Sequence, residues 1–254
     1  MAARLEERWR ALVVVGLGLA APTAALWWER ICARYGEPHR AYHTLQHLHS
    51  MFLLHDELCD ELRDPIVVAL AVFFHDVIYE PTAGDNEEQS AEMFREFAAE
   101  VAAEATGGGA ARGNDKRGGL SAARAQNVCD MILLTKKHTT AAHLDTGTYG
   151  ALDEHYMLDF DMAVLGCDWA QYQQYGRKIR AEYRHIPWTL YQRGRPAVLQ
   201  GFLDTANIFA TRPLRKRLEA RARSNLQREI VELLEAVDEV EWMGGATVID
   251  EGRS

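Results

Sequence analysis

Apolar residues recur along most of this chain at the three- and four-residue spacing of amphipathic helices, and the period-two alternation of strands is nearly absent. The clearest helical stripe lies behind Pro213 and comprises Leu214, Leu218, Leu226, Ile230, Leu233 and Val237. We therefore predict an all-α fold, a helical bundle of about eight or nine helices.

Residues 66–79 form the most apolar of the predicted helices. Asp64 suits the N-cap, Pro65 suits the first helical position, and Pro81 is expected to stop the helix. Because apolar side chains surround almost the whole helix, we expect it to be buried on every side.

Capping residues and helical periodicity predict further helices. Asp85 with Glu88 three positions later resembles a capping box. Gly166 suits a helix end, and Pro196 suits a helix start. The predicted ranges are 85–97, 121–134, 152–165, 168–186 and 196–208.

Residues 11–28 carry no charge, and their length approaches that of a membrane span. Glycines and Pro22 interrupt the segment, and the acidic residues before it are unlike the basic start of a signal peptide. We predict two helices here, over residues 9–19 and 22–35. A membrane span or signal peptide is the alternative.

Two segments differ in composition from the rest. Residues 106–119 are rich in glycine and predict a flexible surface loop inserted between helices. This loop lacks the preceding strand and the GK[ST] ending of a phosphate-binding loop. Residues 243–254 predict a flexible C-terminal tail. We expect one helical domain over residues 1–242.

The composition is that of a globular protein. The chain has 254 residues, of which 48% are hydrophobic and 26% charged, enough to bury a full core. Its formal charge of −9 argues against a grip on a nucleic-acid backbone, which needs a basic face. A small phosphorylated ligand fits better, because a metal ion and a few local basic residues can neutralise it.

The four cysteines are scattered and form no CxxC pair. Their apolar or helical surroundings favour buried free thiols over disulfides or zinc ligands. Free thiols suit a reducing compartment, so we predict a cytoplasmic protein. The cysteines are Cys32, Cys59, Cys129 and Cys167.

His75 and Asp76 lie side by side near the end of the apolar helix predicted over 66–79. A buried carboxylate is costly unless it is paired or binds a metal. Imidazole with carboxylate suits a divalent ion. In the alternative, Asp76 pairs with an arginine and His75 with a backbone carbonyl.

Two further pairs are candidates by their spacing. His43 and His47 are four residues apart, so on a helix they share a face. Asp159 and Asp161 are two apart, so on a helix only one can face a given metal. Taken alone, each is more often a structural or solvated residue.

These residues, in this order, resemble the HD superfamily of metal-dependent phosphohydrolases, and most of all its subgroup of predicted HD phosphohydrolases. The resemblance spans about residues 9–234, with the glycine-rich segment as an apparent insertion. It is carried by EPHRAYH from Glu37 to His43, FHDVIY from Phe74 to Tyr79, DNEEQS from Asp85 to Ser90, TKKH from Thr135 to His138 and RAEY from Arg180 to Tyr183.

The resemblance implies that His47, His75, Asp76 and Asp161 hold a divalent metal ion, which would be Mn, Fe, Zn, Ni, Co or Mg. Asp159 is the alternative to Asp161 as the last ligand.

Neighbouring residues would then contact the substrate. His43 is expected to touch substrate phosphate, and His138 a phosphate or a second metal, with a plain surface histidine as the alternative. Tyr183 shares a helical stripe with Tyr172 and Tyr175. That stripe either packs in the core or lines a nucleobase.

Hydrolysis of a phosphate ester also needs cations for the phosphoryl oxygens and a base for the water. Arg40 and Arg180 are the candidate cations, with surface ion pairs as the alternative. Glu87 would orient or deprotonate the water, unless it only caps its helix. Asp76 would act as a base as well as a ligand.

The sequence thus predicts a hydrolase, a metal-dependent phosphohydrolase that cleaves a phosphate ester or anhydride of a small metabolite or nucleotide through a metal-activated water. It is expected to be a monomer or homodimer and not to associate with a membrane. One alternative is a non-catalytic metal- or ligand-binding protein of the HD fold, and another is a di-iron oxygenase of that fold.

Overall fold

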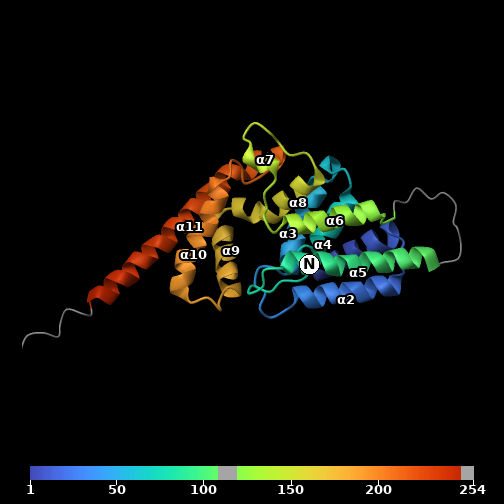
Figure 1. Cartoon of the computed structure of the whole chain (residues 1–254), viewed down its shortest axis with the longest axis horizontal. Helices are drawn as coiled ribbons and strands as arrows, with labels where there is room; N and C mark the ends of the chain where they lie inside the picture. Colours follow the sequence, from blue (N-terminus) through green and yellow to red (C-terminus); the bar gives the residue numbers. More distant parts are fainter. Residues whose placement is uncertain (108–118, 247–254) are drawn as a thin grey trace, which may run out of the picture. The chain divides into compact units, whose positions relative to one another are not determined.

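The chain folds into helices, as the periodicity predicts. The structure is a computed structural model and describes residues 1–107 and 119–246, with side chains up to residue 235 in the last helix. Within these ranges there are eleven α-helices and no β-strand (Figure 1). They are α1 (Ala2–Arg10), α2 (Ala21–Tyr35), α3 (Leu45–Glu57), α4 (Pro65–Phe74), α5 (Asn86–Gly107), α6 (Ala122–Leu134), α7 (Ala141–Leu144), α8 (Asp153–Met162), α9 (Trp169–Glu182), α10 (Trp188–Asp204) and α11 (Arg212–Ala246).

Two compact units divide this chain, where the sequence predicts one domain over residues 1–242. The first unit comprises Met1–Thr140 and Gly150–Asp161, and the second comprises Ala141–Tyr149 and Met162–Ser254. Each unit is described below by itself.

Helix α4 is the core of the first unit. Every residue from Val67 to Phe74 is buried, as its all-round apolar sequence predicts. Rings from three segments pack around its end. Trp9 lies 5.2 Å from Phe73 and 5.3 Å from Phe97 between ring centres.

Helices α2 and α5 run side by side in the first unit (Figure 1). The indole nitrogen of Trp27 donates to Glu100 over 2.7 Å, and Arg30 pairs with Glu96 over 2.8 Å. These polar contacts flank the aromatic core and fix the two helices against each other.

Helix α4 is shorter than the predicted range of 66–79. It ends at Phe74, well before Pro81, and His75–Ile78 form a turn. The prediction of a longer helix was wrong because side chains from other elements hold the backbone of this turn, as the site below shows.

The N-terminal prediction was partly wrong. Helix α1 begins at Ala2 rather than near residue 9 and continues as a π-helical segment over Ala11–Gly16. Gly18 then adopts a φ of 79°, which only glycine takes at no cost. Helix α2 opens with a proline in its first turn, as expected. No helix of the described residues is long and apolar enough to cross a membrane.

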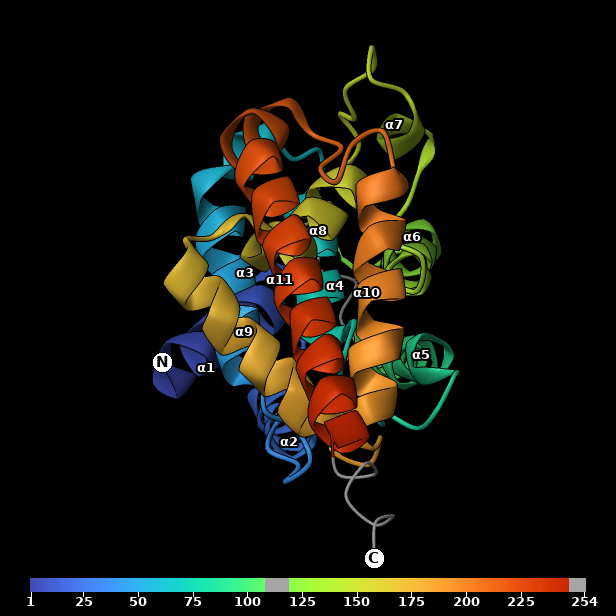
Figure 2. The same cartoon turned by 90° about the vertical axis from the view of Figure 1, so that its left-hand side faces the viewer.

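Helices α9, α10 and α11 form most of the second unit (Figure 2). Pro196 does not open α10, which begins at Trp188, so that prediction was wrong. A proline inside a helix costs about 3 kcal/mol. Burial of Tyr191 and Leu199 on both sides of it offsets this cost.

The two predicted flexible segments fall mostly outside the described residues. Helix α5 extends through Gly107, and α11 extends through Ala246, beyond the predicted boundary at 243. Residues 108–118 and 247–254 lie outside the described part of the chain. The four cysteines are free thiols, and Cys129 is buried while the others are half-buried.

Candidate metal centre

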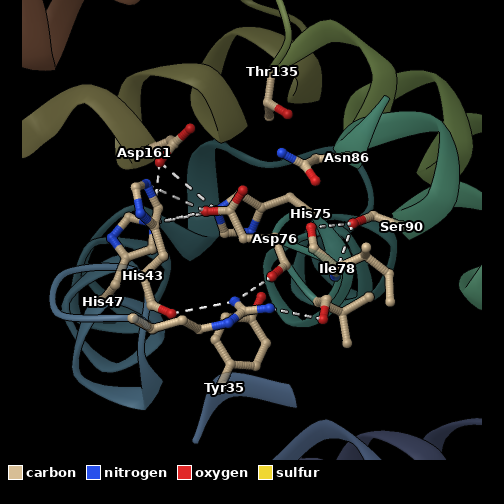
Figure 3. Close-up of polar contacts among 12 residues, drawn as sticks. Tyr35, His43, His47, His75, Asp76, Ile78, Asn86, Ser90, Thr135 and Asp161 are labelled. Atoms are coloured by element: carbon tan, nitrogen blue, oxygen red, sulfur yellow. Dashed lines mark hydrogen bonds and ion pairs between the residues drawn. The ribbon is translucent and has the colours of Figure 1, made fainter. Parts of the chain in front are cut away.

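Four side chains from three separate segments converge in the first unit. They are His47 on α3, His75 and Asp76 in the turn after α4, and Asp161 at the end of α8. One donor atom from each lies within 4.8 Å of all the others. Figure 3 shows these side chains pointing toward one another.

The spacing of the donor atoms suits a metal ion. His75 Nε2 lies 3.0 Å from Asp76 Oδ2, and His47 Nε2 lies 3.1 Å from Asp161 Oδ1. The two Nε2 atoms are 3.2 Å apart. Ligands at ~2.1 Å from a common ion are separated by about 3.0 Å in cis positions and about 4.2 Å in trans positions. Two nitrogen and two oxygen donors therefore fit one divalent ion.

Local structure aims His75 at the cluster. Its Nδ1–H donates to the carbonyl of Val72 over 3.0 Å, which leaves Nε2 as the donor atom toward a metal. His47 is held by α3, whose N-terminus is capped by the Thr44 side chain on the N–H of Gln46.

Two side chains from other segments hold the backbone of the turn that carries Asp76. Arg40 donates to the carbonyls of Asp76 over 2.7 Å and Val77 over 3.1 Å. The Ser90 hydroxyl accepts from the N–H of Ile78 and donates to its carbonyl (Figure 3). These bonds replace those of a further helical turn, and they explain why α4 ends before the His–Asp pair.

Asn86 fixes the chain that leaves the turn. Its side chain accepts from the N–H of Glu80 and donates to the Glu80 carbonyl, each over 3.0 Å. The sequence alone predicts no role for Asn86 or Ser90. Both residues belong to the DNEEQS stretch, Asp85–Ser90, at the start of α5. Their side chains bind the backbone that follows the His–Asp pair, and this stretch is the sequence feature that could have indicated their role.

Asp161, rather than Asp159, belongs to the cluster. Asp159 is fully buried two residues earlier on α8. Asp161 Oδ1 faces His47, and its other oxygen, Oδ2, lies 2.8 Å from His138 Nε2. Only one of the two carboxylates joins the cluster, as their spacing on a helix predicts.

His138 adopts a left-handed backbone with a φ of 49°. It follows α6 and donates its N–H to the Leu134 carbonyl over 3.0 Å. Left-handed backbone is uncommon outside glycine, although histidine is enriched there among the other residues. The strained backbone brings the imidazole to Asp161.

The charges of the cluster shape its ionisation. Burial alone would lower the pKa of His75, but the Asp76 and Asp161 carboxylates raise it to about 9. Burial lowers the pKa of His47 despite its contact with Asp161. Burial would raise the pKa of Asp76, but His75 and His43 hold it below its usual range.

The metal-free protein should therefore lose stability as the pH rises from 6.5 to 9. The raised pKa of His75 contributes stability that is complete below 6.5, its ordinary pKa, and disappears through about 9. The lowered pKa of His47 acts in the opposite direction below 6.5, outside this window. The loss is at most about 3 kcal/mol.

Urea unfolding of EDTA-treated protein at pH 6.5 and 9.5 measures this loss. His75→Gln keeps the side-chain volume and removes the titration, so its two midpoints should differ less than those of the unsubstituted protein. Equal differences in the two proteins would contradict the assignment to His75.

His43 lies beside the cluster, although not on a helix. It precedes α3, so the helical face that it was predicted to share with His47 does not exist. Its Nε2 nevertheless lies 3.9 Å from Asp76 Oδ2, and its ring centre lies 4.1 Å from that of Tyr79. His43 is half-buried and stands next to the four donors.

Arg40 is held by structural partners, and Glu87 lies near a lysine that follows α6 in the first unit. The Arg40 side chain is fully buried, and its donors are taken by Glu37 and by the carbonyls of His43, Asp76 and Val77. Glu87 lies in the first turn of α5 with an oxygen 4.0 Å from Lys136 Nζ.

Arg180 and Tyr183 belong to the second unit. The Arg180 guanidinium donates to the carbonyls of Tyr183 and Ile186. The Tyr183 ring lies 5.8 Å from that of His185.

The buried imidazoles and half-buried carboxylates could together hold a metal ion. Comparison with known proteins adds no further constraint: no family model, no curated protein and no solved structure matches this chain.

Proposed function

We propose that this chain is a metal-dependent phosphohydrolase whose metal is held by His47, His75, Asp76 and Asp161. The convergence of these four donor atoms carries the proposal. The same residues follow the H…HD…D order in which the sequence resembles the HD superfamily. When bound, a divalent ion would acidify a water molecule and steady a phosphoryl oxygen.

The donor set leaves room for that chemistry. Two carboxylates offset the charge of a divalent ion, and four protein donors leave coordination positions open on a five- or six-coordinate ion. The side chains of Asp76 and Asp161 are 18% and 13% exposed, so the carboxylate side of the cluster meets solvent while the imidazole side is closed.

His43 is the residue best placed to meet the substrate. It is half-buried beside Asp76, and its imidazole can donate a hydrogen bond to a phosphoryl oxygen or to a leaving group. Arg40 does not serve here, because its donors already bind backbone carbonyls and Glu37.

The proposal is tested by metal reconstitution followed by a substrate panel. EDTA-treated full-length protein receives Mn²⁺, Fe²⁺, Co²⁺, Ni²⁺, Zn²⁺ or Mg²⁺ and is assayed on aryl phosphates, nucleotides and sugar phosphates. We expect one ion per chain and release of phosphate or of a phosphorylated product. One ion per chain without turnover of any phosphate would favour a non-catalytic metal-binding protein. Two irons with oxygen consumption would favour the oxygenase.

His138 should act as a positioning residue for Asp161. Its Nε2–H donates to Asp161 Oδ2 and leaves Oδ1 toward the two imidazoles. Loss of such a partner behind a metal ligand typically weakens metal affinity 10–100-fold. We therefore expect His138→Gly, which suits the left-handed backbone, to lower the affinity by about that factor without unfolding the protein.

Metal titration of the unsubstituted protein, His138→Gly and His138→Gln measures this effect. Glutamine places an amide N–H near the position of Nε2 and should recover part of the affinity. A stoichiometry that falls from two ions to one in His138→Gly would instead make His138 a ligand of a second metal.

A further inference from the structure

A cavity lies within the second unit, among α9, α10 and α11. Its volume is about 350 Å³. Helix α9 contributes Tyr172 and Arg180, α10 contributes Trp188 and Tyr191, and α11 contributes Glu229. Figure 2 shows these three helices side by side. This cavity shares no residue with the candidate metal centre.

The buried polar groups without a hydrogen-bond partner in the described part of the chain include one on the cavity-lining Tyr191 and one on Arg195, which pairs with the lining residue Glu229. One is the hydroxyl of Tyr191, a residue that is 7% exposed. The other is Nη2 of Arg195, whose side chain is 10% exposed. A buried polar group without a partner costs about 1–3 kcal/mol. The two residues are four apart on α10 and therefore share a face.

Charged side chains of both signs surround these groups. Glu229 pairs with Arg195 Nε over 3.0 Å and also accepts from the Tyr172 hydroxyl. The Arg180 guanidinium lies 4.8 Å from the centre of the Tyr191 ring and donates to backbone carbonyls. The cavity lining also contains Arg177 and Glu232, and Glu232 pairs with Arg228 over 3.2 Å. An oxyanion would satisfy the unpartnered Nη2 of Arg195, because Arg N–H groups match carboxylate and phosphate oxygens.

Aromatic faces line the same cavity. The Trp188 ring stacks on Tyr191 at 5.9 Å between centres and an angle of 18°, and Trp188 is 46% exposed. Trp169 stacks on Tyr172 in the same way, at 5.5 Å and 20°. Indole faces favour planar rings, and the cavity volume exceeds what a bare oxyanion fills.

We propose that this cavity binds a small aromatic anion, with its carboxylate or phosphoryl group at Arg195 Nη2 and the Tyr191 hydroxyl and its ring against the Trp188 indole. Because these two polar atoms are closed to solvent, side chains of the cavity wall must shift as the anion enters. The inference goes beyond the proposed function and does not depend on it.

Binding to EDTA-treated full-length protein tests this site, since removal of metal leaves only carboxylates and imidazoles at the metal centre. Calorimetry and tryptophan fluorescence are followed with phenyl phosphate, with benzoate and with neutral benzyl alcohol. We expect saturable binding of at least one anion with a change in fluorescence, and no saturable binding of the alcohol. A comparison of the affinities for phenyl phosphate and benzoate shows whether the site prefers a phosphoryl or a carboxylate group.

Tyr191→Phe is the decisive variant, because it removes only the unpartnered hydroxyl. We expect the affinity for the bound anion to fall about 10-fold or more, as for a hydrogen bond to a charged group. The midpoint of unfolding should stay equal or rise. Tyr149→Phe, at a tyrosine that is 44% exposed in the same unit, should change neither quantity.

Three results would overturn the site. They are failure of both anions to saturate, equal affinity of the unsubstituted and Tyr191→Phe proteins, and a lower unfolding midpoint in Tyr191→Phe. The last result would mean that the hydroxyl serves the fold.

Discussion

Asp76→Asn should abolish both metal binding and the proposed phosphohydrolase turnover while leaving the chain folded. Asparagine keeps the shape of the side chain but removes the negative charge that faces His75 Nε2 at 3.0 Å. It also replaces an oxygen donor by an amide, a weaker ligand for a hard cation. We expect kcat to fall about 10³-fold or more, equivalent to roughly 4 kcal/mol of transition-state stabilisation.

Asp60→Asn is the matched control, because Asp60 is exposed and lies in the first unit outside the cluster. Bound metal is counted by elemental analysis, and turnover is measured on whichever phosphate ester the unsubstituted protein cleaves. If Asp76→Asn kept stoichiometric metal and more than about a tenth of the activity, the proposed ligand set would be wrong.

The residues at the centre of the site could be predicted from the sequence because their chemistry is exceptional in its context. Asp76 and His75 follow eight buried apolar residues. A carboxylate in such surroundings needs a partner or a metal, regardless of the local backbone conformation. Spacing also predicted that Asp159 and Asp161 face apart, and the structure places only Asp161 in the cluster.

The path of the backbone between these residues could not be predicted in the same way. Periodicity reports which residues are apolar, and Val77 and Ile78 continue the apolar run beyond Phe74. The end of α4 depends on Arg40 and Ser90, which reach the turn from distant parts of the chain. No local pattern carries such contacts, since they exist only after the segments have packed.

Arg40 shows how a residue type can suggest the wrong role. An arginine within a histidine-rich motif suggested a phosphate clamp. Its full burial and four backbone or carboxylate acceptors were not visible in the sequence. Residues 150–161 join the first compact unit after the chain has entered the second, and no local sequence pattern indicates this return.

Arg40→Met should therefore destabilise the protein by about 3–5 kcal/mol, even without metal. The substitution keeps an unbranched apolar stem but leaves Glu37 without its buried partner and removes the donor from three carbonyls. Removal of one member of a buried ion pair typically costs that much. Arg40→Lys should also be destabilising, because one ammonium group cannot reach all four acceptors.

Urea unfolding of EDTA-treated protein measures the loss, with Arg95→Met as the control. Arg95 pairs with Glu92 on the surface of α5, where the two side chains are 48% and 67% exposed, so that control should lose less than about 1 kcal/mol. A structural role for Arg40 further requires that metal affinity falls in Arg40→Met, because the Asp76 turn loses its support. An Arg40→Met protein as stable as the control, with phosphate turnover alone impaired, would return Arg40 to a direct role in binding the substrate.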